Sequence, residues 1–135
     1  MERLFADAFY YIALLVSSDA SHLKANALRD EFEANPSVTT DTVLVEVLAY
    51  VAKRGPQARL QAAGFVDDLR ADPNVTILPQ TTDLFDRALD LYRQRPDKGY
   101  SLTDCMSMII CKDLGITRVL THDKHFQQEG LAILL

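Results

Sequence analysis

The fold of this chain is decided by residues 98–126, KGYSLTDCMSMIICKDLGITRVLTHDKHF. Three apolar residues at the i, i+3, i+4 spacing of a buried helix face occupy its first half: Met106, Ile109 and Ile110. Gly115 then supplies a residue that tolerates the left-handed conformation at a helix end. The aliphatic, β-branched run at 116–120 predicts a strand, and 121–126 begins a further element. This stretch therefore reads as helix, stop, strand and turn.

Both parts of this helix–strand unit carry an acid. Asp104 falls in the first turn of the helix, which Ser101 or Thr103 can cap, and Asp123 follows the strand directly. In a parallel α/β sheet, strand ends and helix starts share one edge, so these two carboxylates can come together there. Such a pair suggests a metal site, provided that the rest of the chain supplies more acids.

The remaining elements predict a single domain spanning residues 1–135. Strands are expected at 3–6, 37–40, 75–78, 116–120 and 131–135, and helices near 8–16, 19–32, 41–54, 57–70, 83–95 and 101–114. Strands that alternate with helices imply a parallel sheet with helices on both faces. We expect a three-layer α/β/α fold with a central, mostly parallel sheet of about four to five strands.

Composition excludes several classes of protein. Hydrophobic residues make up 48% and charged residues 24%, as in globular proteins. No apolar run reaches the roughly 18 residues of a membrane span, and the N-terminus lacks the basic region of a secretion signal. We expect a cytoplasmic protein without a membrane partner. The net charge of −5 means that any nucleic acid must be held by metal ions or by a local basic patch.

Nineteen acids are present, and four of them stand out by position. Asp7 closes the first strand, Glu46 interrupts an apolar helix stripe, Asp104 starts a buried helix, and Asp123 follows the fourth strand. Four carboxylates at one sheet edge would repel each other unless a divalent cation neutralised them. Oxygen ligands of this kind suit Mg²⁺ or Mn²⁺.

Each of these acids also has a simpler explanation. Asp7 can cap the helix that follows it, Asp104 can stabilise a helix N-terminus, and Asp123 can cap a turn. Glu46 resists such an explanation, because a charge within an apolar stripe costs free energy unless it is paired. The coincidence of all four at one edge favours the metal site.

Four segments resemble PIN-domain ribonucleases, especially VapC-like toxins. They are Asp7 after the first strand, TTDTVLVE at 39–46, SLTD at 101–104 and THDKHF at 121–126. The resemblance covers essentially the whole chain, and the last two segments are its most specific matches. Phe9 departs from it, since many members of the family carry a small polar residue at that position.

The resemblance implies a metal-dependent endoribonuclease. Asp7, Asp104 and Asp123, with Glu46 nearby, would hold one or two Mg²⁺ or Mn²⁺ ions that activate a water for attack on an RNA phosphodiester. Glu46 would orient or deprotonate that water, and Thr121 and Thr103 would support the carboxylates. The expected products are a 5′-phosphate and a 3′-hydroxyl. Family partners are an RNA substrate, an antitoxin and a second copy of the chain.

Two other functions remain open at this point. One is a housekeeping ribonuclease with the same site and no antitoxin. The other is a non-catalytic module, either RNA-binding or receiver-like, for which Lys124 is the only loose match to a receiver lysine. His122 and His125 lack the neighbouring cysteine of a zinc site and stay unassigned. Cys105 and Cys111 are expected to be small core residues.

Overall fold

A five-stranded, all-parallel sheet forms the centre of the computed structural model, which describes all residues from 1 to 135. Its strands are β1 (Leu4–Ala6), β2 (Ser37–Thr40), β3 (Val75–Leu78), β4 (Arg118–Leu120) and β5 (Ala132–Ile133). They lie in the order β3-β2-β1-β4-β5. In the central strand, Phe5 pairs in register with Val38 on one side and Val119 on the other. The predicted parallel sheet is confirmed, although β4 and β5 are shorter than their apolar runs.

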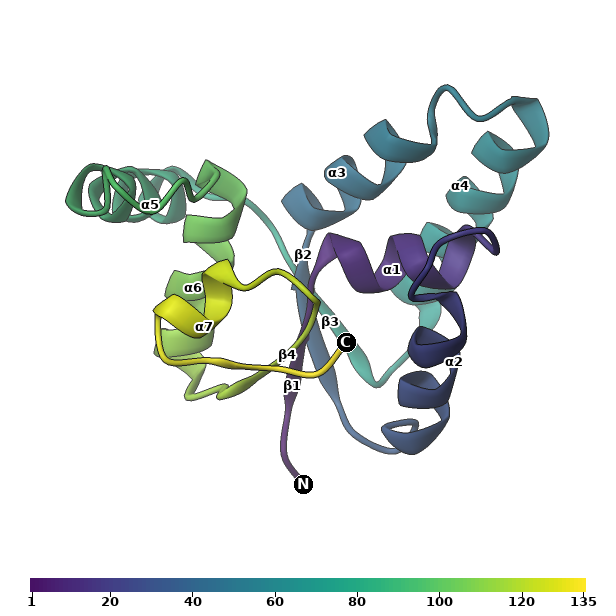
Figure 1. Cartoon of the computed structure of the whole chain (residues 1–135), viewed down its shortest axis with the longest axis horizontal. Coiled ribbons are helices and arrows are strands. Elements are labelled where there is room, and N and C mark those ends of the chain that lie inside the picture. Colours follow the sequence, from purple (N-terminus) through teal and green to yellow (C-terminus); the bar gives the residue numbers. More distant parts are fainter.

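Seven helices form the two outer layers (Figure 1). They are α1 (Ala8–Leu15), α2 (His22–Glu31), α3 (Asp41–Val51), α4 (Pro56–Ala71), α5 (Thr82–Gln94), α6 (Leu102–Leu114) and α7 (His125–Gln128). Figure 1 shows the sheet nearly edge-on, with α1 to α4 on its right and α5 to α7 on its left. The three-layer α/β/α prediction is confirmed. None of the helices combines the length and apolar character needed to cross a membrane.

The core fills both interfaces between the sheet and the helices. Phe5 and Phe126 are the largest side chains without solvent exposure. Val119 on β4 has no exposure either. Cys105 and Cys111 on α6 are also buried and form no disulfide, as expected of small core residues. Their burial ties α6 firmly to the sheet.

The strand order places a crevice at the carboxyl ends of β1 and β4. These strands are neighbours, but β1 continues into α1 in one outer layer and β4 continues toward α7 in the other. Where neighbouring parallel strands connect to opposite layers, the chain leaves a gap at their carboxyl ends, and ligands bind there in α/β proteins. Asp7 and Asp123 follow these two strands.

Candidate active site

Asp7 occupies the deepest position at this edge. Its backbone N–H donates to the carbonyl of Leu120 at 3.2 Å, which ties it to the end of β4. The Thr121 hydroxyl donates to Asp7 Oδ2 at 2.8 Å. Burial raises the pKa of Asp7 to about 7, and the charges of Asp104 and Glu46 add to this rise, whereas the hydrogen bond from Thr121 opposes it. Asp7 is only 3% exposed, so its ionised form is unfavourable at this position.

Asp104 is fixed by the start of α6. Its backbone N–H donates to the Ser101 hydroxyl at 3.0 Å, and the Ser101 N–H donates back to Asp104 Oδ2 at 3.1 Å. This reciprocal capping box satisfies two backbone donors of the first turn and locks the carboxylate in place. Oδ1 accepts no hydrogen bond from the protein and remains available to a ligand. Burial raises the pKa of Asp104, and repulsion from Asp123 contributes.

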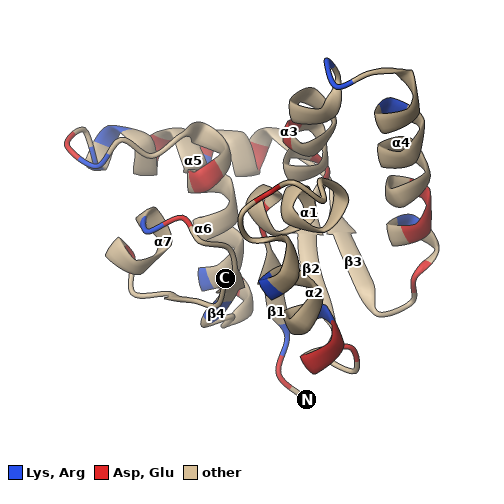
Figure 2. Ribbon diagram, turned by 45° about the vertical axis from the view of Figure 1, so that its right-hand side comes forward, with Lys and Arg blue, Asp and Glu red and all other residues tan.

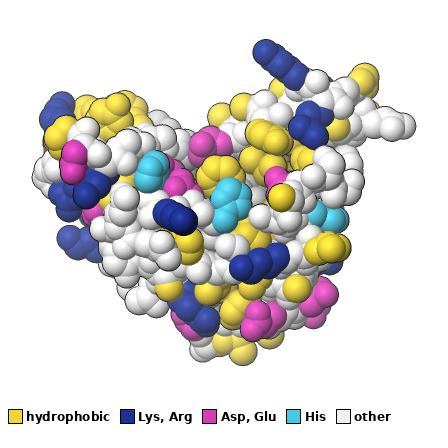
Figure 3. Space-filling model, viewed as in Figure 1, with side chains coloured by type: hydrophobic (Ala, Val, Ile, Leu, Met, Phe, Trp, Pro, Cys, Tyr) yellow, Lys and Arg dark blue, Asp and Glu magenta, His cyan; other side chains and the backbone are white.

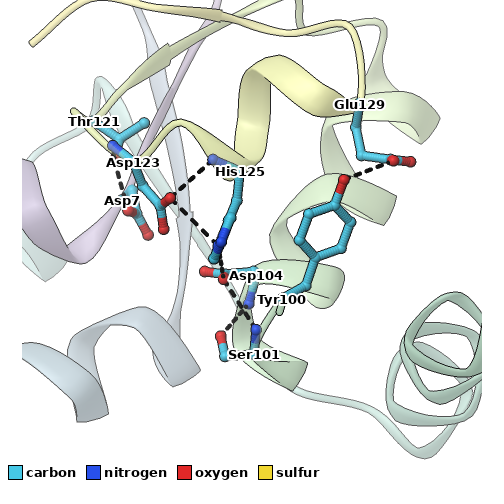
Figure 4. A network of polar contacts seen from close by, with 8 residues as sticks. All are labelled: Asp7, Tyr100, Ser101, Asp104, Thr121, Asp123, His125 and Glu129. Carbon is cyan, nitrogen blue, oxygen red and sulfur yellow. Dashed lines mark hydrogen bonds and ion pairs between the residues drawn. The ribbon is translucent and has the colours of Figure 1, made fainter. Parts of the chain in front are cut away.

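Asp123 is held by the turn that follows β4. Its backbone N–H donates to Thr121 Oγ1 at 3.1 Å, and its Oδ1 accepts from the backbone N–H of His125 at 2.9 Å. The single hydroxyl of Thr121 therefore links the two strand ends, since it also donates to Asp7 (Figure 4). This side chain is fully buried, so the link is shielded from water.

His125 completes the cluster from the first residue of α7. Its Nδ1 lies 3.4 Å from Asp104 Oδ2 and 3.4 Å from Asp123 Oδ1, between the two carboxylates (Figure 4). One ligand atom from each of these three residues fits within 4.8 Å of the others. The ring packs against Tyr100 with centroids 5.3 Å apart, and the Tyr100 hydroxyl donates to Glu129 at 2.9 Å. The imidazole is thereby supported from the side away from the acids.

Glu46 approaches from α3 in the opposite layer. It is half-buried, and its carboxylate accepts no hydrogen bond in the structure. Burial raises its pKa, and repulsion from Asp104 and Asp123 adds to this rise. The mutual influence of these three acids shows that both helical layers contribute carboxylates to one crevice.

No lysine or arginine neutralises this cluster. The ion pairs of arginine and lysine in the chain all involve other acids, and His125 is the only basic side chain with a nitrogen within 4.0 Å of a carboxylate oxygen of this cluster. Figure 3 shows acidic side chains in the notch between the two lobes of the molecule, with histidines beside them. Unpaired carboxylate oxygens with one imidazole nitrogen form a donor set that fits a divalent cation.

A model of the PIN domain family matches residues 5–130. The chain belongs to the PIN domain family. Among solved structures, VapC20 of Mycobacterium tuberculosis, described as a sarcin-ricin loop cleaving toxin, is similar, with a TM-score of 0.81 and 26% identity over 96% of each chain. FitAcB from Neisseria gonorrhoeae shares the fold, with a TM-score of 0.68 and 14% identity over 98% of this chain and 96% of that one. No curated protein matched the sequence at a significant level.

PIN domains are nucleases, so the acidic crevice is the candidate active site of a nuclease. The four acids chosen from the sequence all lie at this edge, where Asp7, Asp104 and Glu46 influence one another's ionisation. Of the two threonines named with them, Thr121 donates a hydrogen bond to Asp7. The Thr103 side chain makes no hydrogen bond to these acids, and Ser101 is the residue that caps α6 and bonds to Asp104.

His125, which with His122 has no role assigned from the sequence, is part of the acidic site in this PIN domain. His125 lies two residues after Asp123, and that spacing carries no signal of its own outside a zinc motif. The capping turn bends the chain back, because the His125 N–H donates to Asp123 Oδ1, and this brings the ring over both acids. The turn chemistry of an Asp followed by a short helix was the one clue available.

Proposed function

We propose that this PIN domain is a divalent-metal-dependent endoribonuclease that acts as the toxin of a toxin–antitoxin pair. The observation that carries the proposal is the convergence of Asp7, Glu46, Asp104 and Asp123 in one crevice without a lysine or arginine partner. The crevice lies in a chain that folds like VapC20, which is described as a sarcin-ricin loop cleaving toxin.

In this proposal the four acids bind the metal, and neighbouring side chains orient two of them. Asp7, Asp104 and Asp123, with Glu46 nearby, would hold Mg²⁺ or Mn²⁺, which when bound activates water and offsets charge on the phosphate. Thr121 holds Asp7 by a hydrogen bond, and Ser101 holds Asp104 through the helix cap. Both carboxylates are therefore oriented before a ligand arrives.

Glu46 is the proton acceptor in this proposal. Its carboxylate is free of hydrogen bonds, and its raised pKa makes it a better base than an ordinary glutamate. It takes the proton from the water that attacks the phosphorus in line. The bond between phosphorus and the 3′ oxygen breaks, and that oxygen takes a proton from solvent. One fragment then carries a 5′-phosphate and the other a 3′-hydroxyl.

An RNA substrate follows from the family and from the likeness to VapC20, and an antitoxin partner follows from the toxin role. A second copy of the chain is a further candidate partner. Large apolar side chains stand exposed on α3 and α4, among them Val45, Tyr50 and Leu60, and could be covered by either protein.

The proposal is tested by incubating purified protein with total RNA and Mn²⁺ and mapping the new 5′ ends. Asp104→Asn should abolish cleavage, because it removes one charge and keeps an oxygen that can accept the Ser101 N–H. The matched control is Asp67→Asn on the exposed face of α4, which should cleave like the wild type. Full activity of Asp104→Asn would refute the assignment of the site.

The toxin role has a separate test. Expression should arrest growth, and co-expression of a small protein encoded by a neighbouring gene should relieve the arrest. Cleavage in vitro without any growth arrest would instead indicate a ribonuclease that works without an antitoxin.

A further inference from the structure

Phe9 is the one exposed side chain of an otherwise enclosed helix. Most of α1 is buried, including Ala8, Tyr10 and Ile12, whereas Phe9 keeps 40% of its surface in contact with solvent. A phenylalanine at that position exposes apolar surface to water, whereas a polar residue would not. The exposure lies at the first turn of α1, two residues after Asp7.

A second aromatic ring lies against Phe9. The ring of His122 has its centroid 4.2 Å from that of Phe9, with 37° between the two planes. His122 is also exposed, and it stands between Thr121 and Asp123 in the turn after β4. The two rings thus come from the two strand ends that carry Asp7 and Asp123. Figure 3 shows hydrophobic and histidine side chains directly beside the acids of the notch.

We propose that the Phe9–His122 ring pair is a stacking platform for an unpaired base of the RNA substrate. The proposal rests on the ribonuclease function and adds the contact that seats the nucleotide next to the scissile phosphate. Aromatic side chains bind splayed-out RNA bases through their faces, and every base has such a face. The ring pair lies at the rim of the crevice, where a base flanking the reacting phosphate would have to rest.

The charge of the molecule explains why such a platform is needed. The chain has a net charge of −5, and the crevice itself is acidic, so the phosphate backbone gains little from long-range attraction. Stacking does not depend on opposite charge, and it therefore holds RNA where electrostatics are unfavourable. Lys124 is exposed on the same turn as His122 and offers one cation for a neighbouring phosphate.

The first test uses the absence of tryptophan from the chain. Phe9→Trp in an Asp104→Asn background places a single fluorophore at the platform of a protein that does not cleave. A single-stranded hexaribonucleotide added with Mg²⁺ should quench its emission, because a stacked base quenches indole. The control is Phe32→Trp in the same background, since Phe32 packs beneath Arg118 at the amino edge of the sheet. Binding without quenching at Phe9→Trp would overturn the platform.

The second test asks whether RNA binding depends on the aromatic ring of Phe9 or only on the size of its side chain. Phe9→Leu and Phe9→Ala should raise the KM for a single-stranded RNA by roughly 5- to 150-fold with a smaller change in kcat, while Phe9→Tyr stays within about threefold of the wild type. The side chain is exposed, and circular dichroism checks that each variant is folded. An unchanged KM in Phe9→Leu, with wild-type cleavage intact, overturns the platform and leaves the ribonuclease proposal standing.

Two further outcomes distinguish the alternatives. Wild-type protein that cleaves no RNA overturns both proposals together. A second copy of the chain could also cover Phe9, and gel filtration tests this: loss of a dimer in Phe9→Ala, with the KM of the remaining monomer unchanged, assigns the ring to an interface and refutes the platform.

Discussion

Acids at the two edges of the sheet have opposite surroundings. At the amino edge, Glu2 accepts from Arg118 at 2.8 Å, and on α6 Asp113 accepts from Arg87 at 2.7 Å. Hydrogen bonds from these arginines lower the pKa of Glu2 and of Asp113. At the carboxyl edge, burial raises the pKa values of Asp7, Glu46 and Asp104, and no lysine or arginine pairs with them.

This difference between the two edges shows that the unpaired acids at the carboxyl edge lower the stability of the folded protein. The molecule has arginines that pair with carboxylates, such as Arg87 with Asp113 and Arg118 with Glu2, and none of them pairs with the acids of the crevice. Figure 2 shows where the basic and acidic positions fall along the ribbon. Uncompensated buried acids weaken the folded state unless a cation joins them. Such a cluster lowers the stability of the folded protein, and binding of a ligand explains why it is kept. Residues with perturbed pKa values gather at functional sites in many proteins.

The largest effect is expected on catalysis. Asp7→Asn should lower RNA cleavage about 1000-fold or more, because it removes a charged oxygen from the site that offsets phosphate charge. Asp113→Asn, which breaks only the ion pair with Arg87, should stay within about twofold of the wild type. Initial rates on a labelled RNA with Mn²⁺ measure both. An equal loss of cleavage rate in the two variants would show that acids at the two edges do not differ in their importance for catalysis.

Folding stability should respond to pH in opposite directions at the two edges. The pKa of Asp7 is raised from 3.8 to about 7 in the folded state, so the folded protein binds a proton that the unfolded chain lacks between about pH 4 and 7. Asp7 therefore favours folding at low pH, and this contribution is lost as pH rises through 7. Asp113 has a lowered pKa, so its contribution is present above its ordinary pKa and is lost as pH falls.

Urea unfolding in EDTA from pH 4.5 to 8 measures this contrast. The stability of Asp7→Asn relative to the wild type should grow with pH by up to roughly 1.4 kcal/mol per unit, the value for one proton. Asp113→Asn should be slightly less stable than the wild type by a nearly constant amount over the same range, because Asp113, with its pKa lowered from 3.8, stays charged throughout and the pair is exposed. A relative stability of Asp7→Asn that does not change with pH would contradict the raised pKa.

A smaller effect is expected at Thr121. Thr121→Val removes the hydrogen bond to Asp7 and the acceptor for the Asp123 N–H, and should reduce cleavage by about 10- to 100-fold. Unfolding free energy should fall by about 1–3 kcal/mol, since a buried donor is left unpaired. Thr117→Val, at an exposed position before β4, is the matched control and should change neither quantity. Wild-type cleavage in Thr121→Val would show that Asp7 needs no such support.

The smallest effect is expected at the amino edge. Glu2→Gln breaks an ion pair with Arg118 that is open to water, and such exposed pairs contribute little to the free energy of unfolding. The loss of unfolding free energy should shrink further in 0.5 M salt, because salt screens exposed charges. RNA cleavage should be unchanged. A loss as large as that of Thr121→Val would show that the amino edge depends on this exposed acid for stability.

Local patterns predicted the order of the elements and most of their bounds. Helical spacing in 98–126 identified α6, and Gly115 does end it, with a φ of 67°. The alternation of strands and helices predicted three layers, and positions beside strand ends and within apolar helices singled out the four acids, which the PIN-family segments also contain. These features depend on residues within a few positions of each other, so a sequence contains them directly.

Only the tertiary structure decided how the acids are held. Thr121 reaches Asp7 across 114 positions of sequence because β1 and β4 pair side by side. His125 lies between Asp104 and Asp123 only because a turn folds α7 back over the start of α6. The pKa of Asp7 likewise depends on burial by other elements. The sequence by itself determined which residue types the site contains. The pairing of distant strands decided which groups those residues contact and how readily they ionise, because the neighbours responsible lie far away along the chain.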